Sequence, residues 1–183
     1  MSALFGLAVD CRFEAAPAYR VGERFDQDKD IGWPTATQAG HRIHQVLRDF
    51  LHLPHGLEGY FDYEQALACA REQGKPLFID FTGHGCTNCR EMEAKVWSHP
   101  SVLKILREDY IILALYVDDR TKLPENEQYV SKNDGRLKNT IGRKNMDIEL
   151  SKFGNNAQPY YVLIGSDEKP LTEPLGYTTN IEK

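Results

Sequence analysis

Several features that would assign a protein to other classes are missing or scarce in this chain of 183 residues. No stretch approaches the roughly 18 consecutive apolar residues of a membrane-spanning helix. The apolar residues 3–9 are too few for the hydrophobic part of a secretion signal and lack a basic flank, so a secretory precursor is not expected. The net charge of −5 argues against a nucleic-acid-binding protein, which needs a basic face.

Cysteine is scarce as well: the chain has four, namely Cys11, Cys69, Cys86 and Cys89. This number does not indicate a scaffold held together by disulfides. Cys69 lies in a predicted helix, where it is explained as a small buried hydrophobic residue. Cys11 is either free or linked to Cys69. Only Cys86 and Cys89 have the spacing of a motif.

The central feature of the chain is the segment 76–93, PLFIDFTGHGCTNCREME. Its apolar run 77–81 ends in a Gly-His-Gly turn, and the residues after Cys86 have helical spacing. This pattern predicts a strand that delivers a Cys-x-x-Cys pair to the first turn of a helix, as in a dithiol redox site. Since the start of a helix stabilises a thiolate, we expect Cys86 to be the exposed nucleophile. Cys89, one turn later, is then the inward-facing resolving thiol.

Two carboxylates accompany the cysteines. Asp80 lies in the middle of the predicted strand, which reads as buried on both faces. Glu93 follows Cys89 by one helical turn and shares its predicted face with Trp97. Because buried carboxylates exchange protons near neutral pH, our hypothesis is that Asp80 and Glu93 manage the proton of Cys89. In the alternative, Asp80 binds a backbone group and Glu93 is solvated at the edge of the helix.

This segment resembles a thioredoxin fold, and more closely the C-terminal thioredoxin-like domain of the thiol:disulfide interchange protein DsbD. The resemblance includes Asp80, six residues before the first cysteine, and Glu93, four after the second. A second motif at 156–163 resembles the loop whose proline is cis in thioredoxin folds, here Pro159. One departure is Ala114, at a position in the third strand where thioredoxin has lysine.

The resemblance implies an α/β fold of the thioredoxin type, with a central mixed sheet flanked by helices, and the activity of a thiol:disulfide oxidoreductase. Gln158 and Pro159 would hold an extended substrate, and His84 and Gly85 are grouped with them as substrate-binding residues. No organic cofactor and no metal are expected. The implied partners are disulfides of periplasmic proteins, with an upstream membrane-embedded domain as electron donor. The chain is therefore expected to be a soluble periplasmic domain, excised from or tethered to a membrane protein.

The domain organisation is predicted from periodicity and turn signals. Residues 1–56 form an N-terminal extension or linker with one amphipathic helix, 35–52, and residues 57–183 form the thioredoxin-like domain. This domain carries an insertion at about 118–150, before the cis-proline loop, and a terminal helix that is cut short. The elements expected in it are strands at 57–61, 77–82, 111–117, 160–164 and 171–177, helices at 63–73, 86–97, 102–106 and 145–153, and a hairpin around 132–135.

Two other functions are compatible with the sequence. In a metal-binding protein, Cys86 and Cys89 would act together with His84 and His99, although one Cys-x-x-Cys pair without a second is a poor structural zinc site. In a non-catalytic interaction module, the two cysteines would only close a helix turn.

Overall fold

The computed structural model describes residue 11 and residues 53–182 of the chain. Its centre is a three-stranded sheet in the order β2-β1-β5, composed of β1 (Leu77–Thr82), β2 (Ile111–Tyr116) and β5 (Tyr160–Ile164). β1 is parallel to β2 and antiparallel to β5, so the sheet is mixed. The predicted class of α/β fold is therefore confirmed.

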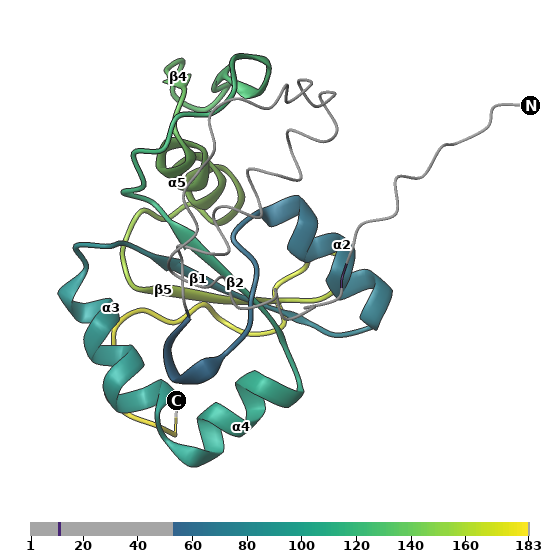
Figure 1. Ribbon diagram of the computed structural model, residues 1–183, viewed down its shortest axis with the longest axis vertical. Helices are drawn as coiled ribbons and strands as arrows, with labels where there is room; N and C mark the ends of the chain where they lie inside the picture. Colours follow the sequence, from purple (N-terminus) through teal and green to yellow (C-terminus); the bar gives the residue numbers. More distant parts are fainter. Residues whose placement is uncertain (1–10, 12–52, 183) are drawn as a thin grey trace, which may run out of the picture.

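Helices cover both faces of this sheet (Figure 1), with α2 and α5 on one side and α3 and α4 on the other. These helices are α2 (Tyr63–Gln73), α3 (Thr87–Met92), α4 (Pro100–Glu108) and α5 (Ile141–Phe153). Alternate residues of β1 enter different cores because successive side chains of a strand point to opposite faces. Leu77, Ile79 and Phe81 pack with α2, whereas Phe78 packs with the residues of α3 and α4.

The cysteine helix has two parts. α3 continues directly into a π-helical turn, Glu93–Trp97, and together they cover the range predicted for one helix. α4 begins at Pro100, two residues earlier than predicted. Pro100 starts the helix because proline is favoured in the first turn, where its missing N–H is not needed.

Two predicted strands are reduced to single bridges. Around residue 60 only Tyr60 pairs, in parallel with Leu113, because Asp62 already caps α2 by accepting the Gln65 N–H. Within the segment 171–177, a single antiparallel bridge joins Leu175 to Tyr161 of β5, and a second bridge, just ahead of the segment, joins Pro170 to Ile164. Pro174, which has no N–H to donate, lies between them.

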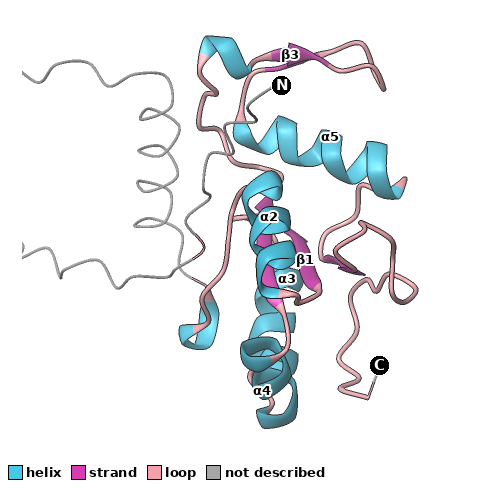
Figure 2. Ribbon diagram, turned by 90° about the vertical axis from the view of Figure 1, so that its right-hand side faces the viewer, coloured by secondary structure: helices cyan, strands magenta, loops and turns pink. Residues whose placement is uncertain are grey.

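The segment predicted as an insertion, 118–150, includes most of α5, which starts at Ile141 because Thr140 caps it. This helix packs against β2 and so belongs to the domain's layers. Ahead of α5 lies the predicted hairpin, β3 (Tyr129–Val130) and β4 (Leu137–Lys138), which is drawn beside α5 in Figure 2.

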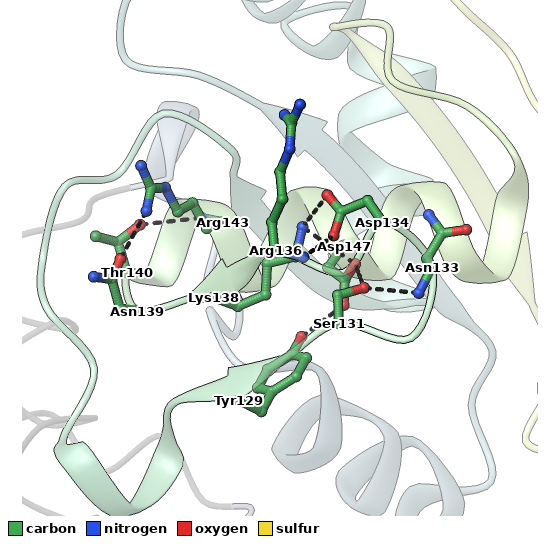
Figure 3. A network of polar contacts seen from close by, with 10 residues as sticks. All are labelled: Tyr129, Ser131, Asn133, Asp134, Arg136, Lys138, Asn139, Thr140, Arg143 and Asp147. Atoms are coloured by element: carbon green, nitrogen blue, oxygen red, sulfur yellow. Dashed lines mark hydrogen bonds and ion pairs between the residues drawn. The ribbon is translucent and has the colours of Figure 1, made fainter.

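A polar network ties this hairpin to α5 (Figure 3). The buried ammonium group of Lys138 lies 2.7 Å from Asp134 and 3.4 Å from Asp147. Asp147, on α5, also accepts hydrogen bonds from Ser131 at 2.6 Å and from Tyr129 at 2.9 Å. The buried charges of the hairpin are therefore compensated within it and by the helix below.

A disulfide joins Cys11 to Cys69, which is completely buried in α2. Of the two alternatives left open for Cys11, the linked one is observed. The helix predicted at 35–52 lies outside the described residues. No helix within residues 53–182 is long and apolar enough to cross a membrane.

Candidate active site

The two motif cysteines lie at the start of α3 and are joined by a disulfide, with their Cα atoms 5.3 Å apart. Cys86 is the N-cap residue, and its sulfur accepts the backbone N–H of Cys89 at 3.1 Å. Cys89 is 0% exposed, whereas Cys86 is partly exposed. The local geometry follows from the sequence, since the glycine-rich turn ends β1 and the helix begins one residue after Cys86. Only Cys86 is accessible to another molecule.

Asp118 holds the turn that precedes Cys86, a role that the sequence analysis missed. Its carboxylate accepts the backbone N–H of His84 at 2.8 Å and that of Gly85 at 3.0 Å. A Cβ atom at Gly83 would lie 3.1 Å from this carboxylate, so the close approach favours glycine there. Burial raises the pKa of Asp118, but the hydrogen bonds from Gly85 and His84 outweigh it and leave the pKa below its ordinary value.

Asp80 lies two residues after Phe78 in β1, so both side chains point to the face that the cysteine helix covers. It is 2% exposed, and its Oδ1 atom has no hydrogen-bond partner among the described residues. Its neighbours in register are Ala114 and Tyr161. Burial, followed by the charge of Glu93, raises the pKa of Asp80 well above its ordinary value, against the opposing charge of Arg90.

Glu93 is 7% exposed and therefore faces inward rather than being solvated at a helix edge. Its carboxylate forms an ion pair of 2.8 Å with Arg90, whose guanidinium group also donates to Thr82 Oγ1 at 3.0 Å. Burial raises the pKa of Glu93, although the charge of Arg90 opposes it. Arg90 is thus a cation whose charge acts on both carboxylates. Ala114, beside Asp80, supplies no charge. The spacing of three residues between Arg90 and Glu93 is the signal that could have identified this cation.

The peptide bond between Gln158 and Pro159 is cis, as expected from the second motif. Gln158 lies across a groove of about 480 Å³ from the cysteine turn. This groove is lined by Gly83, Gly85, Cys86, Thr87, Asn88, Val117, Asp118 and Gln158. Three of the predicted residues, Cys86, Gly85 and Gln158, therefore border one surface.

His84 is not among the lining residues, although it was predicted to bind substrate. Its ring stacks on Tyr116, with the ring centroids 4.3 Å apart. Within residue 11 and residues 53–182, no three His, Cys, Asp or Glu side chains are grouped as they would be around a metal ion. The sulfurs of Cys86 and Cys89 are bonded to each other.

Residues 58–163 match the family model described as thioredoxin-like. No curated protein matches the sequence. Among solved structures, the oxidoreductase DsbH is 16% identical with a TM-score of 0.50, and the match covers 71% of this chain and 81% of that one. A thioredoxin from Thermus thermophilus is 19% identical (TM-score 0.44; 66% of this chain, 75% of that one).

The C-terminal domain of DsbD from Neisseria meningitidis, in its oxidised form, is 18% identical with a TM-score of 0.42. That match covers 66% of this chain and 89% of the DsbD domain. At these identities, similarity to solved structures speaks only for the fold. The family model spans more than half of the sequence and includes the cysteine pair and the cis-proline, so the chain belongs to the thioredoxin-like family.

Proposed function

We propose that this protein is a thiol:disulfide oxidoreductase that reduces disulfides of partner proteins through Cys86 and Cys89. The observation that carries the proposal is the unequal exposure of the two sulfurs beside a groove. Cys86 borders the groove that Gln158 also lines, whereas Cys89 is completely buried behind it. A nucleophile must be accessible to a polypeptide, and a resolving thiol must reach only the nucleophile.

The reaction starts from the reduced protein. The Cys86 thiolate attacks one sulfur of the partner disulfide, forming a mixed disulfide and releasing the other partner sulfur as a thiolate. The Cys89 thiolate then attacks Cys86, forming the intramolecular disulfide and releasing the second partner sulfur. Two electrons pass from the dithiol to the partner, and two protons end on the partner's thiols. An external dithiol must reduce the protein again before the next cycle.

Asp80 and Glu93 would accept the proton that Cys89 loses before it attacks. Asp80 lies under the cysteine helix and Glu93 on its inward face. Both have a pKa raised by burial, which brings a carboxyl group closer to the range useful for proton transfer near neutral pH. The charge of Arg90 favours the ionised carboxylates and so keeps the pKa values of Asp80 and Glu93 from rising further. Proton transfer within the fold suits a thiol that solvent does not reach.

The substrate would lie in the groove as an extended segment beside cis-Pro159. Proline offers no N–H, so the backbone of Gln158 is the nearest pairing group for such a segment. The exchange needs no organic cofactor and no metal. Partners in the periplasm and electrons from a membrane-embedded domain are part of this proposal and come from the resemblance to DsbD.

A redox titration with glutathione buffers tests the couple itself. We expect a reversible two-electron transition between about −120 and −270 mV. The roles are tested with insulin. Cys89→Ser, reduced beforehand and freed of reductant, should accumulate a mixed disulfide with insulin. Cys86→Ser should have no dithiothreitol-driven reductase activity. Cys11→Ser is the control for loss of a cysteine outside the groove. Although the open bridge lowers its stability, it should remain active under conditions where circular dichroism shows that it is folded. Equal residual activity in the Cys86 and Cys89 variants, or a disulfide that cannot be reduced, would contradict the proposal.

A further inference from the structure

A further buried carboxylate, outside both the cysteine helix and β1, contacts a side chain that lines the groove. Glu149 lies on α5 and is 0% exposed. Its Oε2 atom accepts a hydrogen bond of 2.9 Å from the side-chain amide of Gln158, and its Oε1 atom has no partner among the described residues. Gln158 in turn precedes cis-Pro159 and lines the groove beside Cys86. The chemistry proposed for the cysteines makes no use of Glu149.

The hydrogen bonds of Gln158 define the direction of its amide. Nε2 donates its two hydrogens to Glu149 and to the backbone carbonyl of Asn156, the latter at 3.1 Å. An ionised carboxylate can only accept hydrogen bonds, so it requires the Nε2 end of the amide. This leaves Oε1, an acceptor, as the amide atom available to the groove. Protonation of Glu149 removes the charge that strengthens its hydrogen bond with Nε2, and the Asn156 carbonyl is then the stronger remaining acceptor for this amide.

Glu149 is isolated from the charged groups around it. The lysines on α5 and on the hairpin packed against it are each paired with a carboxylate: Lys144 with Asp62, Lys152 with Glu168, and Lys138 with Asp147. Arg143, the remaining cation of α5, donates to the amide oxygen of Asn139. Burial raises the pKa of Glu149 to about 7, and the hydrogen bond from Gln158 opposes this increase. The carboxyl group therefore changes its ionisation state near neutral pH.

We propose that Glu149 is a positioning residue for the groove, whose ionised form holds the Gln158 amide with its acceptor end toward the substrate. The ligand it favours is an extended polypeptide disulfide that presents a backbone or side-chain N–H to this acceptor. Protonation weakens the hold on the amide and so weakens substrate capture. The inference rests on the proposed function, because it assumes that a disulfide-bearing polypeptide occupies the groove.

A measurement that does not need activity tests the coupling directly. In a ¹⁵N NMR titration of the oxidised protein, the side-chain NH₂ signals of Gln158 should shift with a midpoint near the pKa of Glu149, about 7. The signals are identified by their loss in Gln158→Ala. In Glu149→Gln the titration should disappear, and in Glu72→Gln, the exposed control on α2, it should persist. Signals of Gln158 that do not titrate in the wild-type protein overturn the inference, whatever the enzymatic result.

Kinetics separate positioning from mere structural support. Between about pH 8 and about pH 6, the wild-type KM for insulin should rise by a factor on the order of 3 to 10, as for one hydrogen bond lost. Glu149→Gln should remove this pH dependence of KM. When the substrate is 5,5′-dithiobis(2-nitrobenzoate), which has no peptide N–H, Glu149→Gln should have the same pH profile as the wild-type protein.

The outcomes distinguish the two proposals. A wild-type protein without any reductase activity contradicts the proposed function, and the NMR titration still decides on Glu149. An active wild-type protein whose KM depends on pH in the same way after Glu149→Gln contradicts the positioning role alone. If Glu149→Gln changes the pH dependence equally for insulin and for 5,5′-dithiobis(2-nitrobenzoate), the positioning role is also contradicted. Such a result would indicate an effect on Cys86 rather than on the groove.

Discussion

The buried carboxyl group of Glu149 lowers the stability of the folded protein, and this effect can be measured as a pH dependence of the free energy of unfolding. The pKa of Glu149 is raised by burial from 4.5 to about 7, and the side chain is 0% exposed. A group with a raised pKa in the folded state binds more protons there than in the unfolded state between these two values. The free energy of unfolding contributed by Glu149 therefore falls as the pH rises from about 4.5 to about 7.

The magnitude follows from the same two values. A difference of about 2.5 pH units corresponds to about 3 kcal/mol, at 1.36 kcal/mol for each unit. Below pH 4.5 both states are protonated and the penalty is absent, whereas above pH 7 the wild-type protein carries all of it. The amide in Glu149→Gln cannot ionise. Relative to wild type, the free energy of unfolding of this variant should therefore increase by about 3 kcal/mol from acid to alkaline pH. The constant cost of placing an amide there cancels in this difference.

Urea unfolding followed by circular dichroism, without reductant and at several pH values, provides the assay. The stability difference between Glu149→Gln and wild type should change with a midpoint between the two pKa values and then level off. Glu72→Gln, on the exposed side of α2, should run parallel to wild type at every pH. If Glu149→Gln also runs parallel, the pKa of the carboxyl group is the same in the folded and unfolded states, and the reasoning from its burial is refuted.

Two further predictions concern other parts of the fold. Cys11→Ser opens a disulfide with Cys69 that spans 58 residues, and loop-closure entropy gives an expected loss of about 4 kcal/mol in urea unfolding without reductant; an unchanged midpoint would contradict this bridge. Asp118→Ala removes the acceptor of the His84 and Gly85 N–H groups, and at this exposed position we expect a loss of about 1 to 2 kcal/mol. The same variant should shift the glutathione midpoint, and an unchanged stability and midpoint together would show that the carboxylate does not hold the turn.

Much of the cysteine site could be predicted because its chemistry is contiguous in the sequence. β1 occupies the predicted residues 77–82, and its apolar run left Asp80 as a buried exception. The period of the helix placed Glu93 inward beneath the cysteines. In each case one local pattern, strand or helix, determines which way the side chain points.

Other residues of the site depend on which elements meet. Asp118 reaches the cysteine turn because β1 and β2 are parallel neighbours and end at the same edge of the sheet. Glu149 contacts Gln158 because α5 lies under the cis-proline loop. Neither contact has a signal in local periodicity. The prediction of continuous strands at 57–61 and 171–177 was wrong for a related reason, since capping and prolines reduce the pairing to single bridges.

The order of residues by itself determined that two cysteines start a helix after a buried strand, because spacing and turn chemistry act over a few residues. The same local pattern predicted that Cys86 faces out and Cys89 faces in. Only the tertiary structure decided that Cys86 shares a groove with Gln158, and that Cys11 is bonded to Cys69. Burial and pairing at a distance depend on how layers pack against one another, and that information is distributed over the whole chain.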